Sequence, residues 1–200
     1  MQTKRILNIA SGKIAPLDLS VKNISYFIVN VDTMFYDYEE PDIVEDQYKF
    51  WDPSKSVQFN VKEDIFTFLE RTMMKFDRIC IYRFLEHVPF DKVLYFIYLL
   101  STVTNKDAEI DVIVPNYLIL ANMILEEDPL DPAFGNFEAH NILLTTELLN
   151  EPSCPHASIW TYLRAQYFFE LENRFKIIDE CNHFDFDGRN IYLRFWAKRL

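Results

Sequence analysis

The sequence predicts an α/β fold in which a mostly parallel sheet carries helices on both faces. Short apolar runs rich in β-branched residues alternate with stretches whose apolar residues recur at helical spacing. This alternation is typical of parallel strands joined by crossover helices. The chain closes on two strand-like runs separated by a polar stretch, which predicts an antiparallel last strand.

Five runs are expected to form parallel strands, and two more to form the closing pair. The first run is apolar and β-branched, as befits a strand buried on both faces. The parallel strands are expected at Arg5–Ala10, Tyr26–Val31, Ser56–Asn60, Arg78–Tyr82 and Ile110–Val114, and the closing strands at Phe175–Ile178 and Ile191–Ala197.

The clearest predicted helix begins near Phe90. Val93, Leu94, Ile97 and Leu100 follow it at helical spacing, and the pattern stops near Thr104-Asn105. Other helices are expected within Leu17–Asn23, Phe68–Met74, Ala139–Leu149 and from about Ala157 to Glu172.

Length and composition fit one domain over residues 1–200. Half of the 200 residues are hydrophobic, which is enough for a full core. Two Pro-rich breaks, at residues 126–132 and 151–156, interrupt the alternation of strands and helices. We therefore expect a variable segment around residues 118–156.

The charge and the cysteines limit the class of protein. A formal net charge of −11 argues against nucleic-acid binding, which depends on Lys and Arg. Three cysteines without metal-ligand spacing predict reduced thiols, no metal and a cytoplasmic location. The longest apolar run, Val93–Leu100, is too short to span a membrane, and the N-terminus lacks a signal peptide's apolar region. The oligomeric state is not indicated.

Small residues, Ser11-Gly12-Lys13, follow the first strand. Such a turn lets a ligand approach the backbone at the carboxyl edge of the sheet, where open α/β sheets bind ligands. An ordinary strand-to-loop turn explains the same residues. The acid- and Tyr-rich stretch 34–51 has two interpretations as well, a solvated surface or a lid over a ligand.

Two acids follow predicted strands. Asp32 ends the second strand about 20 residues after the first loop, where an acid commonly accepts hydrogen bonds from a ribose. Asp64 follows the third strand, where it would meet a ring amine. Either acid alone fits a strand-end cap, whereas the pair at one edge of the sheet favours a ligand.

From Arg5 to Arg199 the chain resembles the class I S-adenosylmethionine-dependent methyltransferases. The resemblance implies their seven-stranded Rossmann-like sheet with an antiparallel last strand. It rests on the order and spacing of Leu7–Gly12, Val31-Asp32, Glu63–Ile65, Phe76–Ile79, Leu85–Val88, Arg174–Ile178 and Asn190–Phe195.

The resemblance implies S-adenosylmethionine as the cofactor and a small-molecule or glycan-like acceptor of the methyl group. His87 is the candidate for removing a proton from the acceptor, and a locally packed helix-start residue is the alternative. The Asn/Asp-Pro-Pro-Tyr/Phe signature of amino-methyltransferases is absent after the fourth strand, which argues against methylation of nucleic-acid bases. The implied cofactor-binding residues are Asn8, Ala10, Ser11, Gly12, Asp32, Thr33, Met34, Asp64, Ile65 and Arg83.

The first loop departs from the family pattern, which usually reads acidic-X-Gly-X-Gly-X-Gly. Asn8, Ala10, Gly12 and Ile14 stand at those positions. Binding that is weaker, altered or absent would follow. The alternative function is therefore a catalytically inactive methyltransferase-fold module for binding or assembly. A nucleotide-binding oxidoreductase is disfavoured, because an antiparallel ending is not typical of that fold.

Restoring glycine at both substituted positions, with Ala10→Gly and Ile14→Gly, should tighten S-adenosylmethionine binding. Glycine removes the side chains that hold the ligand away from the backbone. The change also costs up to about 1 kcal/mol of stability per site through added freedom of the unfolded chain. Calorimetric titration measures the affinity, and no binding by either protein at millimolar cofactor would favour the inactive module.

Overall fold

The computed structural model describes residues 2–9, 24–33, 52, 55–125, 157–184 and 192–200. Several expected features lie outside these residues: the Ser11-Gly12-Lys13 turn, the helices within Leu17–Asn23 and Ala139–Leu149, and the acidic stretch 34–51. The predictions made for them stay predictions.

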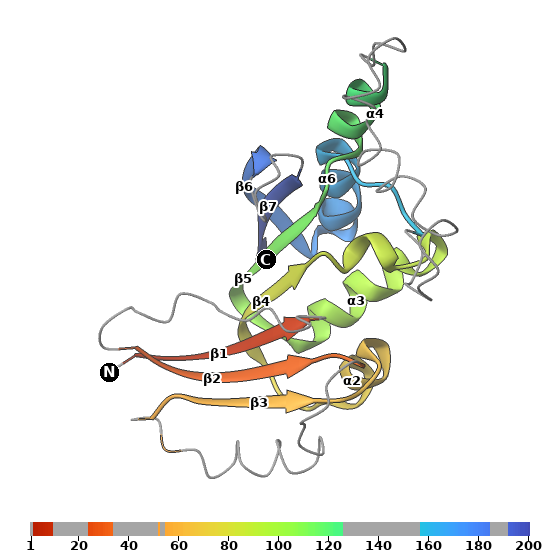
Figure 1. The fold of residues 1–200 in the computed structure, drawn as a ribbon. Helices are drawn as coiled ribbons and strands as arrows, with labels where there is room; N and C mark the ends of the chain where they lie inside the picture. The colour runs from red at the N-terminus through yellow and green to blue at the C-terminus, as the bar shows by residue number, and fades with distance from the viewer. Residues whose placement is uncertain (1, 10–23, 34–51, 53–54, 126–156, 185–191) are drawn as a thin grey trace, which may run out of the picture.

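A seven-stranded sheet forms the centre of the protein (Figure 1). Its strand order is β3-β2-β1-β4-β5-β7-β6, so the first strand lies inside the sheet as expected. The first five strands are parallel, and β7 runs antiparallel to both β5 and β6. The predicted fold class is confirmed. The strands are β1 (Gln2–Ile9), β2 (Ile24–Val31), β3 (Val57–Val61), β4 (Phe76–Tyr82), β5 (Thr104–Pro115), β6 (Phe175–Phe184) and β7 (Tyr192–Arg199).

Helices lie against both faces of the sheet. The main core packs α2 (Ile65–Arg71), α3 (Val93–Val103) and α6 (Tyr162–Glu170) on the face that carries Leu7 and Phe27. On β5, Val112 and Val114 face this core, and Ile113 between them faces the other side. There Ile113 packs with Tyr117 of α4 (Tyr117–Leu125).

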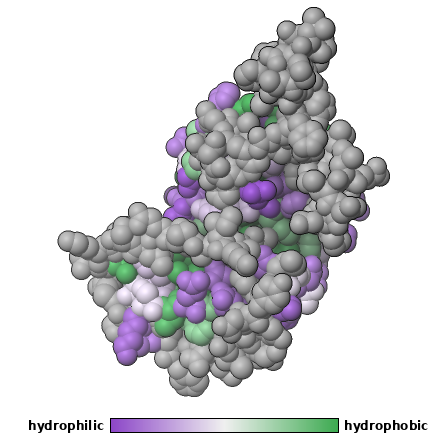
Figure 2. Space-filling model, in the orientation of Figure 1, coloured by the Kyte–Doolittle hydropathy of each residue, from purple (hydrophilic) through white to green (hydrophobic). Residues whose placement is uncertain are grey.

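Each described helix is too short or too polar to cross a lipid bilayer. Three single 3-10 turns complete the described helical elements: η1 (Leu85–His87), η2 (Phe90–Lys92) and η3 (Leu171–Asn173). The face drawn in Figure 2 carries hydrophilic residues next to hydrophobic ones.

Helix boundaries differ from the expected ones because polar caps set them. The helix expected at Phe68–Met74 begins instead at Ile65, since the Asp64 carboxylate accepts the backbone N–H groups of Phe66 and Thr67. It ends at Arg71, where Thr72 turns extended. The apolar periodicity found this helix and misplaced its ends.

The last helix also begins later than expected. The helix expected from Ala157 starts at Tyr162, because the Thr161 hydroxyl accepts the backbone N–H of Arg164 and caps it. Residues 157–160 are not helical. The sequence reasoning missed α4, whose first turn is capped by the Asn116 side chain accepting the N–H of Leu118. It also ended β6 too early, at Ile178 rather than Phe184.

A buried carboxylate joins the three strands in the middle of the sheet. Asp111 on β5 is 0% exposed. It accepts hydrogen bonds from Arg194 of β7, at 3.0 and 2.8 Å, from Arg78 of β4, at 2.6 Å, and from the Tyr82 hydroxyl at 2.8 Å. Burial alone would raise the pKa of Asp111, but the hydrogen bonds and charge of Arg194, with help from Tyr82 and Arg78, hold it below the usual value.

Asp111→Asn should destabilise the fold strongly. The substitution keeps the shape of the side chain and leaves the charges of Arg78 and Arg194 without their carboxylate. Breaking a buried ion pair from one side typically costs about 3–5 kcal/mol of unfolding free energy, which urea denaturation measures. Asp107→Asn is the matched control, because Asp107 lies on the same strand, exposed and paired with Lys198. Equal urea midpoints for the two variants would contradict the assignment.

Candidate functional site

The carboxyl ends of four parallel strands meet at one edge of the sheet. Ile9 of β1 is in register with Val31 of β2 and with Ile81 of β4, and Val31 is in register with Val61 of β3. The arrowheads of β1, β2 and β3 accordingly lie together in Figure 1. Ligands of open α/β sheets bind outside this edge.

The two predicted acids both lie at this edge. Asp32 follows β2 directly, is half-buried, and its backbone N–H donates to the Val61 carbonyl at 3.0 Å. Asp64 is exposed, and its Oδ1 atom caps α2 as described above. The cap accounts for the position of Asp64, and its contact with a ligand stays a prediction.

The other predicted residues divide between the edge and the core. Thr33 is exposed next to Asp32, whereas Ile65 is buried in the main core. Ala10, Ser11, Gly12 and Met34 lie outside the described residues.

Asn8 is part of a buried ladder of amides across three strands. Its Nδ2 donates to Asn30 Oδ1 at 3.2 Å, and Asn30 Nδ2 donates to Asn60 Oδ1 at 2.9 Å. The ladder follows the strand register, in which Asn8, Asn30 and Asn60 are paired. Asn8 is 3% exposed, and within the described residues its Oδ1 atom has no hydrogen-bond partner. The end of β1 therefore carries an unused buried acceptor.

Arg83 and His87 belong to the turn that follows β4. Arg83 has a φ of 55°, a left-handed conformation that is uncommon for a residue with a Cβ atom. Its backbone N–H donates to the Ile113 carbonyl at 2.8 Å, which holds the turn against β5. His87 is half-buried at the end of η1, and its backbone N–H donates to the Phe84 carbonyl. Strained backbone of this kind is common at functional sites.

Glu86 is a candidate site residue that the sequence reasoning did not name. Its side chain is 1% exposed, and its Oε2 atom has no hydrogen-bond partner among the described residues. Burial raises the pKa of Glu86 to about 8, against smaller lowering contributions from its own backbone N–H and the charge of Arg83. The sequence signal was a charged residue between Leu85 and Val88, both of which are buried.

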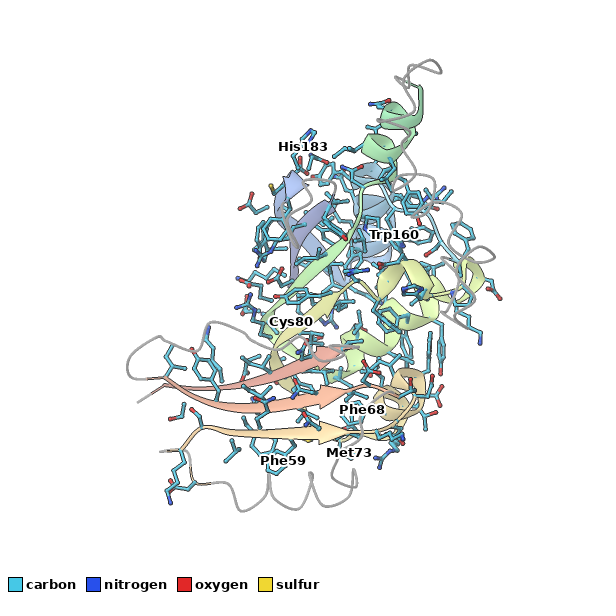
Figure 3. The ribbon with its side chains drawn as sticks, viewed as in Figure 1. Phe59, Phe68, Met73, Cys80, Trp160 and His183 are labelled. Carbon is cyan, nitrogen blue, oxygen red and sulfur yellow. The ribbon has the colours of Figure 1, made fainter. Side chains whose placement is uncertain are left out.

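Hydrogen bonds tie the turn at Glu86 to residues 157–160, which precede α6, and Trp160 in turn contacts the first residue of α4. The Glu86 carbonyl accepts the N–H groups of Ala157, at 2.8 Å, and Ser158, at 3.0 Å. The Leu85 carbonyl accepts the Trp160 indole N–H at 3.2 Å, and the Trp160 carbonyl accepts the N–H of Tyr117. Trp160, labelled in Figure 3, thus links η1 to the beginnings of both α4 and α6.

Comparison with known proteins identifies the fold. The chain matches no protein-family model and no curated protein. Among solved structures it is similar to the cyclopropane synthase MmaA2 from Mycobacterium tuberculosis, with a TM-score of 0.57 and 14% identity over 90% of this chain. It is also similar to a SAM-dependent methyltransferase from Methanosarcina mazei, with a TM-score of 0.56 and 15% identity over all of this chain. The chain has the class I methyltransferase fold.

The lengths of these structures differ. The match spans 57% of MmaA2, so this chain corresponds to little more than half of that synthase, whereas it spans 94% of the Methanosarcina mazei protein. A mycolic acid cyclopropane synthase crystallised with SAH gives a TM-score of 0.61 at 12% identity, over 99% of this chain and 79% of the synthase. The class I methyltransferase fold is thus matched along nearly all of the chain.

Glu86→Gln should stabilise the protein increasingly as the pH rises. The unfolded chain ionises this acid near pH 4.5, whereas the folded protein keeps it neutral up to about pH 8. Wild-type stability therefore falls with pH between these values, and the uncharged amide avoids the loss. The difference in unfolding free energy should grow by up to about 1.4 kcal/mol per pH unit. Urea denaturation from pH 4.5 to 8.5 measures it; a pH-independent difference would refute the buried acid.

Proposed function

We propose that this protein transfers a methyl group from S-adenosylmethionine to a small-molecule or glycan-like acceptor. The observation that carries the proposal is a pair of buried oxygens without a hydrogen-bond partner among the described residues, Asn8 Oδ1 and Glu86 Oε2, at the carboxyl edge of a sheet with the class I methyltransferase fold. Two lone acceptors favour a ligand that brings donors or positive charge. S-adenosylmethionine has an ammonium group and a sulfonium, so the residues at this edge fit it.

Residues of four strand ends would hold the cofactor. Asp32, after β2, would accept hydrogen bonds from the ribose hydroxyls, and Asp64, after β3, would meet the ring amine. Asn8 would serve the ammonium end from β1, and Arg83 borders the site after β4. Ala10, Ser11, Gly12, Thr33, Met34 and Ile65 complete the set that the sequence predicts. When bound, the cofactor supplies an electrophilic methyl group.

The chain's own contribution to catalysis is alignment and proton removal. A methyl transfer needs the acceptor atom in line with the sulfonium, and a base for the proton that the acceptor loses. His87 is the proposed base, because it lies in the turn after β4 and directly follows Glu86 in the sequence.

The acceptor class follows from charge and from the residues after β4. The net charge of −11 and the absence of the Asn/Asp-Pro-Pro-Tyr/Phe signature disfavour a nucleic-acid acceptor.

Cys80 and Cys181 are free thiols, which fits the proposed cytoplasmic location. Cys80 lies on β4, as Figure 3 shows.

A non-catalytic binding or assembly module is the second candidate. The observation that favours it is the pair of residues Ala10 and Ile14, where the family usually has glycine. Calorimetric titration with S-adenosylmethionine and S-adenosylhomocysteine separates the two functions. Transfer of labelled methyl to small acceptors then tests for catalysis.

Asp32→Ala should weaken binding of S-adenosylmethionine by about 1–3 kcal/mol, the usual loss for a hydrogen bond to a charged group. Calorimetry measures the dissociation constant. The matched control is Asp179→Ala, an exposed acid on β6 at the far edge of the sheet, which should bind as the wild type does. An unchanged affinity for Asp32→Ala would reject the ribose contact.

A further inference from the structure

We propose that Glu86 is the counter-ion of the cofactor's sulfonium: its carboxyl group gives up a proton when S-adenosylmethionine binds and takes one back when the neutral product S-adenosylhomocysteine is left. This inference rests on the proposed function and assigns a second role at the same site. In this proposal Glu86 is the group that distinguishes S-adenosylmethionine, which carries a positive sulfonium, from the neutral product S-adenosylhomocysteine.

Position singles out Glu86 among the buried polar groups. Within the described residues, four buried side-chain atoms lack a hydrogen-bond partner: Asn8 Oδ1, Arg78 Nε, Glu86 Oε2 and Glu180 Oε2. Arg78 lies within β4, and Glu180 lies on the outermost strand β6, which β5 and β7 separate from β4. Asn8 and Glu86 lie near the carboxyl ends of β1 and β4, and of these two only Glu86 has a side chain that can carry a negative charge.

Few of the described groups around Glu86 carry a positive charge. From its own turn it meets the positive charge of Arg83, and His87 is next in sequence. From α4 it faces Tyr117, whose pKa is raised by burial and by the charge of Glu86. From residues 157–160 come Ser158 and Trp160, which cannot carry charge and hydrogen-bond the Leu85 carbonyl. Burial outweighs Arg83 and raises the pKa of Glu86 to about 8.

A sulfonium beside such an acid reverses this balance. An opposite charge within a few ångströms lowers the pKa of a carboxyl group, most strongly in a site shielded from water. The buried acid then ionises, and one proton leaves to solvent for each bound donor. The backbone carbonyl of Glu86 accepts hydrogen bonds from the N–H groups of Ala157 and Ser158, which fixes the backbone position of the residue that becomes charged.

The methyl transfer restores the starting state. The bond between sulfur and the methyl carbon breaks, and its electron pair stays on sulfur, which becomes a neutral thioether. The acceptor atom forms the new bond to carbon and loses its proton to the base. Without the sulfonium the pKa of the Glu86 carboxyl group rises again, and it takes up one proton. Charge and protons therefore balance over one turnover.

Calorimetry in two buffers of different ionisation enthalpy, phosphate and Tris, counts the protons released on binding. At pH 7 the wild type should release close to one proton more with S-adenosylmethionine than Glu86→Gln does. With S-adenosylhomocysteine the two proteins should release equal numbers. Protonation of the cofactor's own amino group is common to both proteins and cancels in this comparison.

Two further variants and a pH series sharpen the test. Glu180→Gln, which removes the other glutamate with an unpartnered oxygen, should keep the wild-type proton count, and Glu86→Asp, which retains an acid, should still release protons. The excess of the wild type over Glu86→Gln should vanish above about pH 9, where Glu86 is already ionised in the free protein. Thermal melting confirms that each variant is folded.

The possible failures are distinguishable. If neither ligand binds to the wild type, the proposed function fails. If both ligands bind, and the wild type and Glu86→Gln release equal numbers of protons with S-adenosylmethionine, the counter-ion assignment is overturned while the proposed function stands. The same holds if Glu86→Asp releases no more protons than Glu86→Gln, or if Glu180→Gln loses the excess as well.

Discussion

The buried carboxylate of Asp111 is the constraint on which the rest of the sheet depends. A charge with no exposure is tolerated only when its partners satisfy it, and here they come from β4 and β7. Arg194 reaches Asp111 only if β7 lies beside β5 in the observed antiparallel register. The same carboxylate accepts the Tyr82 hydroxyl and so fixes the last residue of β4. Asp111 thus holds both the antiparallel strand β7 and the last residue of β4, after which the turn with Arg83 and Glu86 begins.

Hydrophobic pattern was sufficient to predict the strands and their order of appearance, because buried strands need apolar runs wherever they lie. It could not place helix ends, since Asp64 and Thr161 act through single hydrogen bonds that leave no periodic trace. It also missed α4, where Tyr117 to Leu125 are apolar on most sides and show no clear helical face. The hydrophobic pattern did not give the order of strands across the sheet, in which β7 lies between β5 and β6.

The candidate site was predictable in its location and not in its electrostatics. The position of Asp32 at the carboxyl edge was predictable, because the strand ends of a parallel sheet converge. Glu86 was passed over in favour of its neighbour His87, whose ordinary pKa lies nearer neutrality. Burial raises the pKa of Glu86 to about 8. Burial depends on the distant residues Ser158 and Trp160, so no local pattern in the sequence reveals it.

Backbone hydrogen bonds hold the chain on both sides of the segment that the sequence predicts to be variable. The chain leaves the edge at Tyr117 and returns to it at Ala157, and both points are tied to the same turn through Trp160 and Glu86. These backbone hydrogen bonds hold the turn that carries Glu86 next to both points. An acid kept neutral and unpartnered costs stability, and natural sequences keep such costs mainly where function needs them. The place of this cost, at the edge where parallel sheets bind ligands, is the physical reason for assigning Glu86 to the cofactor rather than to the core.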